Sequence, residues 1–114
     1  PWVIGRSIRL KNKYRTLDNL EESYFRDHPE EIDSYVAEIF SQYASDGDSA
    51  ALLASLRVIA KVKGITQLAK QTGMTRQGLQ KALSNKGNPR LDNVNAIMGA
   101  LGYSLTPEKI TIAR

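Results

Sequence analysis

Apolar residues recur every three or four positions over much of this chain, which is the spacing of an amphipathic helix. The clearest stripe follows His28-Pro29-Glu30-Glu31, where a proline and two carboxylates favour the first turn of a helix. Its apolar members are Ile32, Tyr35, Val36, Ile39, Phe40 and Tyr43. We interpret this stripe as the core-facing side of a helix. Dimerisation and partner binding are the alternatives for the same surface.

The same periodicity predicts further helices over residues 17–27, 49–63, 66–72, 75–84 and 91–101. Gly64 and Gly102 are placed to end two of them, and Ser45-Asp46-Gly47-Asp48 provides a turn and a cap. The residues expected to face inward are Leu52, Leu53, Leu56, Ile59 and Ala60, then Leu91, Val94, Ile97, Met98 and Leu101. Tyr103-Ser104-Leu105 is the one short strand predicted there. The predicted fold class is all-α.

Residues 66–83 have the pattern of a helix-turn-helix, with a small residue at the crossing, a glycine at the turn and an apolar wedge. These positions are taken by Ala69, Gly73, Met74, Leu79 and Leu83. Thr75 is placed to cap the second helix through its hydroxyl. That helix then displays donor-rich side chains of the types that contact bases or phosphates of DNA, namely Arg76, Gln77, Gln80 and Lys81.

Charge divides the chain into blocks, although the net charge is only +4. Residues 1–15 carry five basic groups and no acid, and residues 16–48 carry ten acids against Arg26 alone. Residues 49–114 carry ten basic groups against Asp92 and Glu108. The basic third block contains the helix-turn-helix, as attraction to phosphate requires. The acidic block suits a basic partner, or is simply a solvated face.

These observations divide the 114 residues into four segments. We predict a basic arm or disordered extension over 1–16 and an acidic helical extension over 17–47. A helix-turn-helix DNA-binding domain is predicted over 48–106 and a tail over 107–114. The arm's loose alternation of apolar residues fits a strand or a mobile segment, and the pattern does not decide between them.

Catalysis, metal binding and cofactor binding have little support in this sequence. It has no cysteine, and its single histidine, His28, is explained by a helix start. No histidine joins the carboxylates of Glu21, Glu22, Glu30, Glu31 and Asp33 at ligand spacing. Asp46 and Asp48 lack the later ligands of a calcium loop. With no membrane-spanning run or signal-peptide pattern, we expect a cytoplasmic protein that is not an enzyme.

The order of the helices resembles the phage repressor and Cro-like helix-turn-helix superfamily. That resemblance implies a lambda-repressor-like domain of four to five helices, here with an N-terminal helical extension. A closer resemblance, over residues 33–106, is to the antidote proteins of addiction modules, the HigA-like antitoxins. It is carried by Tyr35-Val-Ala-Glu, Gly47-Asp48, Leu56-Arg-Val-Ile-Ala, Gly64-Ile-Thr-Gln-Leu-Ala, Gly87-Asn-Pro and Ala100-Leu-Gly-Tyr-Ser-Leu. Two departures are Arg90, where a Ser or Thr cap is usual, and Gly78 within the second helix of the motif.

The resemblance implies a role for each exposed residue of the motif. Base readers would be Arg76, Gln77, Gln80 and Lys81, and phosphate contacts would be Thr66, Gln67, Thr75, Lys86, Asn88 and Arg90. Lys86 and Asn88 could equally form a solvated turn. The implied DNA partner is a double-stranded, palindromic operator bound by a homodimer. The final helix and 103–105 are expected in the dimer surface.

Two function classes follow. In the first, the chain is the antitoxin and operator-binding autorepressor of a toxin-antitoxin module, with a basic, RelE-like ribonuclease toxin as partner. In the second, it is a stand-alone phage-type repressor without a toxin. A helix-turn-helix that serves only protein contacts is a third interpretation of the same motif.

Overall fold

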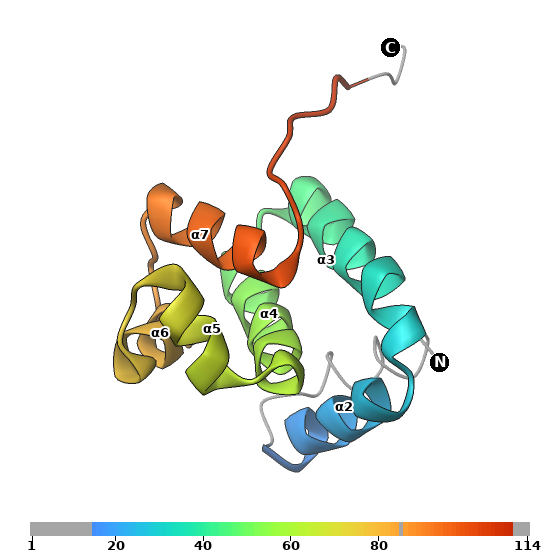
Figure 1. Cartoon of the computed structure of the whole chain (residues 1–114). Coiled ribbons are helices and arrows are strands. Elements are labelled where there is room, and N and C mark those ends of the chain that lie inside the picture. Colours follow the sequence, from blue (N-terminus) through green and yellow to red (C-terminus); the bar gives the residue numbers. More distant parts are fainter. Residues whose placement is uncertain (1–14, 85, 111–114) are drawn as a thin grey trace.

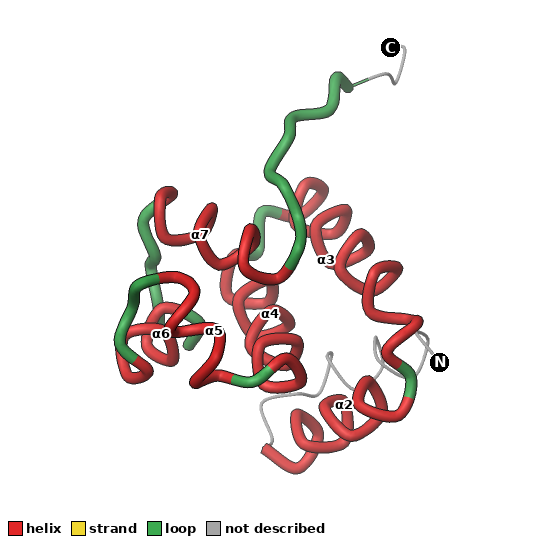
Figure 2. The backbone as a smooth tube through the Cα atoms, viewed as in Figure 1, coloured by secondary structure: helices red, strands yellow, loops and turns green. Residues whose placement is uncertain are grey.

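The computed structural model describes residues 15–84 and 86–110, and every regular element within them is helical. These elements are α2 (Arg15–Asp27), the 3-10 turn η1 (Pro29–Glu31), α3 (Ile32–Asp46), α4 (Ser49–Lys63), α5 (Ile65–Thr72), α6 (Arg76–Ala82) and α7 (Leu91–Leu101). Figure 2 shows these helices joined by loops. The predicted all-α class is confirmed. The predicted arm falls outside the described residues, apart from Arg15 and Thr16 at the start of α2.

The predicted helix ends have clear local causes. Gly47 ends α3 in a left-handed conformation with φ of 66°, and its N–H donates to the Tyr43 carbonyl over 2.7 Å. Asp48 then caps α4, because its carboxylate accepts from the Ala51 N–H at 3.1 Å. Gly102 ends α7 with φ of 98°. The predicted turn, cap and stop at these positions are therefore confirmed.

The core surrounds α4. Val58, Ile59 and Ala60 are consecutive, and none is more than 1% exposed. Helices α2, α3 and α5 all contact α4, and α5 in turn contacts α6 and α7. Figure 1 shows α4 between α2 and α3 on one side and α5, α6 and α7 on the other. The stripe over 32–43 packs into this core through Ile32, Tyr35, Val36 and Ile39.

Two predictions about the last helix and the residues after it are wrong. Leu91 was expected to face inward, but it is 77% exposed, because it is the first residue of α7 and the buried residues of that helix lie further along, at Ile97, Met98 and Leu101. Tyr103-Ser104-Leu105 is extended without being a strand. A strand needs a neighbour to receive its hydrogen bonds, and no described residue supplies one to this segment.

Three side chains join helices that are distant in sequence. Arg26 of α2 donates to the Lys61 carbonyl in the last turn of α4 over 3.1 Å. Arg57 of α4 donates to the Leu83 carbonyl at the end of α6 over 3.0 Å. The Tyr103 hydroxyl, after α7, donates to the carboxylate of Asp33 in α3. Burial and that hydrogen bond raise the pKa of Tyr103 to about 12.

The loop between α6 and α7 depends on one glycine. Gly87 donates its N–H to the Ser84 carbonyl over 2.9 Å. A Cβ atom at this position would press on the Ala82 carbonyl and lie 2.7 Å from the Lys81 carbonyl oxygen. Since both are backbone atoms at the end of α6, the loop would have to move away from the helix to accept any larger residue.

We therefore predict that Gly87→Ala lowers the free energy of unfolding by about 1–3 kcal/mol. Gly99→Ala is the matched control, because Gly99 lies within α7 and a Cβ there would meet nothing within 4 Å. The control should gain about 1 kcal/mol from the higher helix propensity of alanine. Urea unfolding followed by circular dichroism measures both changes. Equal effects of the two substitutions would contradict this account of the loop.

Candidate nucleic-acid interface

Helices α5 and α6 are held together by a glycine turn whose hydrogen bonds are complete. Gly73 has φ of 76°, its N–H donates to the Lys70 carbonyl over 3.4 Å, and the Met74 N–H donates to the Ala69 carbonyl over 3.1 Å. This pair of bonds is a Schellman motif, which requires a left-handed residue at the glycine position. The predicted role of Gly73 is confirmed.

A buried wedge fixes α6 against α5. Leu79 is fully buried, Leu83 is 1% exposed and Ala69 is 5% exposed, while Met74 is half-buried beside them. The residues predicted to form the wedge are therefore buried, and α5 and α6 are in contact. A helix of seven residues is not stable alone in water, so α6 owes its position to this packing.

Thr75 caps α6 as predicted. Its hydroxyl accepts from the Gly78 N–H over 2.9 Å, and its backbone is extended in the manner of an N-cap residue. A Cβ on Gly78 would lie 2.9 Å from the same hydroxyl oxygen. Gly78, which departs from the expected pattern, thus leaves room for the cap.

The starts of α5 and α6 lie next to each other, and one hydrogen bond joins them. The Arg76 guanidinium donates to the Thr66 hydroxyl over 2.8 Å. Thr66 is in the first turn of α5 and Arg76 is the first residue of α6. Sequence reasoning named both residues but assigned them to different groups and missed their contact. Thr66 and Arg76 are ten residues apart, and no local sequence pattern predicts a hydrogen bond between residues at that separation.

All ten residues predicted to contact DNA are exposed, and they fall into four places. Thr66 and Gln67 lie at the start of α5, and Thr75 and Arg76 lie at the start of α6. Gln77, Gln80 and Lys81 lie on the side of α6 away from Leu79. The loop before α7 holds the remaining three, which are Lys86, Asn88 and Arg90.

Arg90 does not cap α7 through its side chain. It instead lies 3.6 Å from the carboxylate of Asp92, and both side chains are largely exposed. A surface pair of this kind contributes little to stability. Its guanidinium therefore remains available to another anion.

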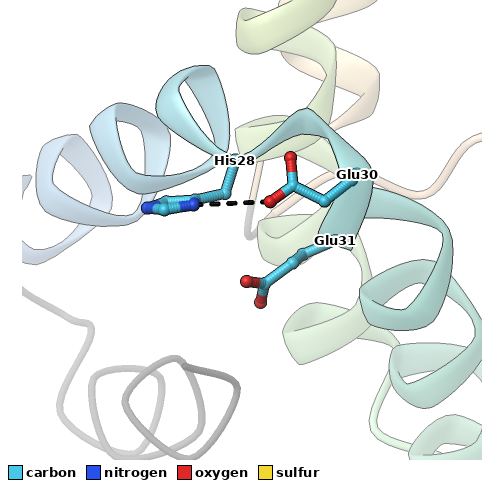
Figure 3. Close-up of side chains that lie close together, drawn as sticks. All are labelled: His28, Glu30 and Glu31. Atoms are coloured by element: carbon cyan, nitrogen blue, oxygen red, sulfur yellow. Dashed lines mark ion pairs between the residues drawn. The ribbon is translucent and has the colours of Figure 1, made fainter.

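The structure also gathers a cluster that sequence reasoning missed. His28, Glu30 and Glu31 surround η1, with their candidate ligand atoms all within 4.8 Å of one another (Figure 3). The expectation that no histidine joins these carboxylates at ligand spacing is wrong for Glu30 and Glu31, because the tight 3-10 turn brings positions 28, 30 and 31 to one side. The sequence signal that could have found this cluster is a histidine followed two and three residues later by glutamates, with a proline between them that starts a turn.

Contacts within the protein account for this cluster. The Tyr24 ring stacks on His28 with centroids 4.4 Å apart, and the Tyr24 hydroxyl donates to Glu31 over 2.8 Å. Desolvation and this bond raise the pKa of Tyr24 to about 12. His28 Nδ1 lies 3.5 Å from Glu30, and its side chain caps no helix. The cluster thus joins the end of α2 to the start of α3.

Fold and site together define a small all-helical protein that presents a capped polar helix on a buried wedge. Residues 16–109 match the family model described as probable addiction module antidote protein, and the chain belongs to this family. It is also similar to an uncharacterized protein of Haemophilus influenzae, 38% identical over 84 residues, which cover 74% of this chain and 82% of that protein. No solved structure matches the chain.

Membership of this family confirms the antidote resemblance and implies a toxin partner of some kind. Antidotes of addiction modules are generally not enzymes, and whether this chain lacks an activity stays an expectation from its sequence. No helix in the described part of the chain has the length and apolar character needed to cross a bilayer.

We predict that Thr75→Ala lowers the free energy of unfolding by about 1 kcal/mol, because the Gly78 N–H loses its acceptor. Thr75→Ser keeps the hydroxyl and should stay close to wild type. Thr66→Ala loses only the exposed hydrogen bond from Arg76 and should change stability much less than Thr75→Ala. Thermal unfolding of the three variants measures these differences. A Thr75→Ala variant as stable as wild type would show that the cap contributes nothing to the free energy of unfolding.

Proposed function

We propose that this protein is an antitoxin that binds and represses its own operator, through a lambda-repressor-like helix-turn-helix formed by α5 and α6. The observation that carries the DNA half of this proposal is the outer face of α6. There Gln77, Gln80 and Lys81 are exposed on a helix seated by Leu79 and Leu83. A polar helix that is exposed on its outer face and held in place by buried leucines on its inner face suits insertion into a major groove.

The side chains of α6 have the chemistry of base readout. Glutamine can donate to and accept from an adenine edge, and arginine or lysine can donate to guanine. We therefore assign base contacts to Arg76, Gln77, Gln80 and Lys81. Each good bidentate pair discriminates against a wrong base by about 1–3 kcal/mol.

Phosphate contacts are assigned to the residues around that face. The first amides of α5, with Thr66 and Gln67, point out of a helix N-terminus, where anions are favoured. Thr75 lies at the start of α6, and Lys86, Asn88 and Arg90 lie on the loop before α7. The bond from Arg76 to Thr66 places a guanidinium between the two groups, so Arg76 can serve both.

A single unit of this size covers only part of one DNA turn. Two copies related by a two-fold axis would place two α6 helices one turn apart, roughly 34 Å, on a palindromic operator. The homodimer is therefore part of the proposal. We also propose that the protein is cytoplasmic, which agrees with a sequence that has no cysteine and so no disulfide.

The toxin half of the proposal rests on the family and on the acidic block. Asp27, Glu30 and Asp33 are exposed around the junction of α2 and α3, within a segment that holds ten of the twelve acids of the chain. This surface suits a basic partner such as a RelE-like ribonuclease. Family membership disfavours the alternative of a stand-alone phage-type repressor.

A salt titration of binding to the DNA upstream of its own gene tests the repressor function. Wild type should bind this DNA well above scrambled DNA, with affinity falling steeply as salt rises. Gln77→Ala/Gln80→Ala should lose the preference for upstream DNA and keep weak, nonspecific binding. Lys86→Ala should instead weaken binding to both DNAs and reduce the salt slope. Equal wild-type binding to both DNAs would contradict sequence-specific repression.

Co-expression with the product of the adjacent gene tests the antitoxin function. That product should arrest growth, and this chain should restore it. Glu30→Lys should weaken the complex several-fold at low salt, because it reverses an exposed charge in the acidic block. Gln71→Lys, which adds a positive charge on the exposed side of α5 outside the block, is the control. Failure of wild type to restore growth would contradict the antitoxin assignment.

A further inference from the structure

The chain after α7 leaves the helices and runs extended into solvent (Figures 1 and 2). Its first residue is anchored, because the Tyr103 N–H donates to the Met98 carbonyl over 2.8 Å and its hydroxyl bonds to Asp33. Residues 104–110 are all exposed and make no hydrogen bond to the described part of the chain. Their backbone donors and acceptors therefore have no protein partner among the described residues.

Exposed apolar side chains lie on this segment and at the start of α7. Ile110 is 80% exposed and Leu91 is 77% exposed, which makes them the most exposed large apolar side chains in the described residues. Leu105 is 37% exposed. An open hollow of about 570 Å³ is lined by Leu105, the residues at the start of α7, and Asn95. Leu91 and Leu105 thus share one uncovered surface.

An extended backbone with free hydrogen-bonding groups and flanking apolar side chains is a template for a further strand. We propose that residues 104–110 pair antiparallel with the same residues of a second copy of this chain, and that Leu91 and Leu105 are covered in the resulting dimer. The inference rests on the proposed function, since a palindromic operator requires two copies related by a two-fold axis.

A second copy fits this surface because a two-fold interface must be complementary to itself. Antiparallel pairing of one segment with its own copy meets that condition. The charges meet it too: Glu108 and Lys109 lie side by side on the segment, and Arg90 and Asp92 lie on the rim of the hollow. Each copy can therefore offer both signs to the other.

Pro107 is compatible with this pairing. Proline lacks an N–H, and in a two-stranded ribbon half of the N–H groups point away from the partner strand. The pairing also explains why no strand forms within one chain although the pattern of 103–105 predicts one. The missing neighbour would be the other copy.

Sedimentation equilibrium over a wide concentration range tests the interface with the full chain. Wild type should be a reversible dimer, and Leu105→Asp/Ile110→Asp should dimerise at least 100-fold more weakly. Leu20→Asp is the matched control, since Leu20 is 55% exposed but lies on α2, and it should leave the dimer unchanged. A monomeric wild type, or a double variant as dimeric as wild type, would overturn the proposal.

Single cysteines test the strand pairing itself, because the chain has none of its own. Placed one at a time at positions 104–110, they should form an intermolecular disulfide fastest at one position and more slowly to either side, since only residues near the two-fold axis meet their own copies. Equally fast reaction at every position would indicate parallel pairing, and slow reaction throughout would indicate none; either overturns the inference.

These measurements separate the interface from the repressor function. A wild-type dimer that is lost in Leu105→Asp/Ile110→Asp, but that shows no preference for upstream DNA, supports the interface and contradicts the repressor. Specific DNA binding by wild type that the double variant keeps at full affinity, with both proteins monomeric, overturns the interface and leaves base recognition standing.

Discussion

The burial of α4 is the constraint on which the rest of the structure depends. Val58, Ile59 and Ala60 follow one another and are almost completely inaccessible. Successive residues of a helix point about 100° apart, so a run of three buried residues requires cover on most of the helix surface. Helices α2, α3 and α5 provide that cover. The acidic N-terminal helices and the helices of the candidate interface are therefore built on one element.

The position of α6 follows from this arrangement. Because α6 is short, its direction is set by the glycine turn after α5, by Leu79 and Leu83 beneath it, and by Arg57, which reaches from α4 to the carbonyl at its end. The polar outer face can then carry residues that contribute nothing to folding. Under the proposed function, residues on this face could be exchanged to change base recognition without disturbing the packing beneath them.

Charge is separated in space as it is in sequence. The exposed acids of α2 and α3 lie on one side of α4, and α6 lies on the other (Figure 1). An acidic surface repels DNA, and at physiological salt the field of exposed charges decays over about 8 Å, so this repulsion weakens with distance from the surface. Under the proposed function, a basic toxin and an operator would thus approach from different sides of the molecule.

The sequence by itself determined the helices, their ends and the wedge, because these depend on contacts within a few residues. The stripe over 32–43, the cap at Thr75 and the stop at Gly73 are all present as the local pattern indicates. It also placed the chain in the antidote family. The ten candidate DNA contacts were chosen from the sequence, and their exposure agrees with that choice without testing it.

Only the tertiary structure decided which distant residues meet. The bond from Arg76 to Thr66, the cluster around His28, and the link from Tyr103 to Asp33 join residues brought together by chain turns and helix packing. Periodicity also failed at Leu91 and at 103–105, because burial and strand pairing depend on a neighbour that the pattern of one segment does not specify. Whether an apolar position is covered is a property of the assembled molecule.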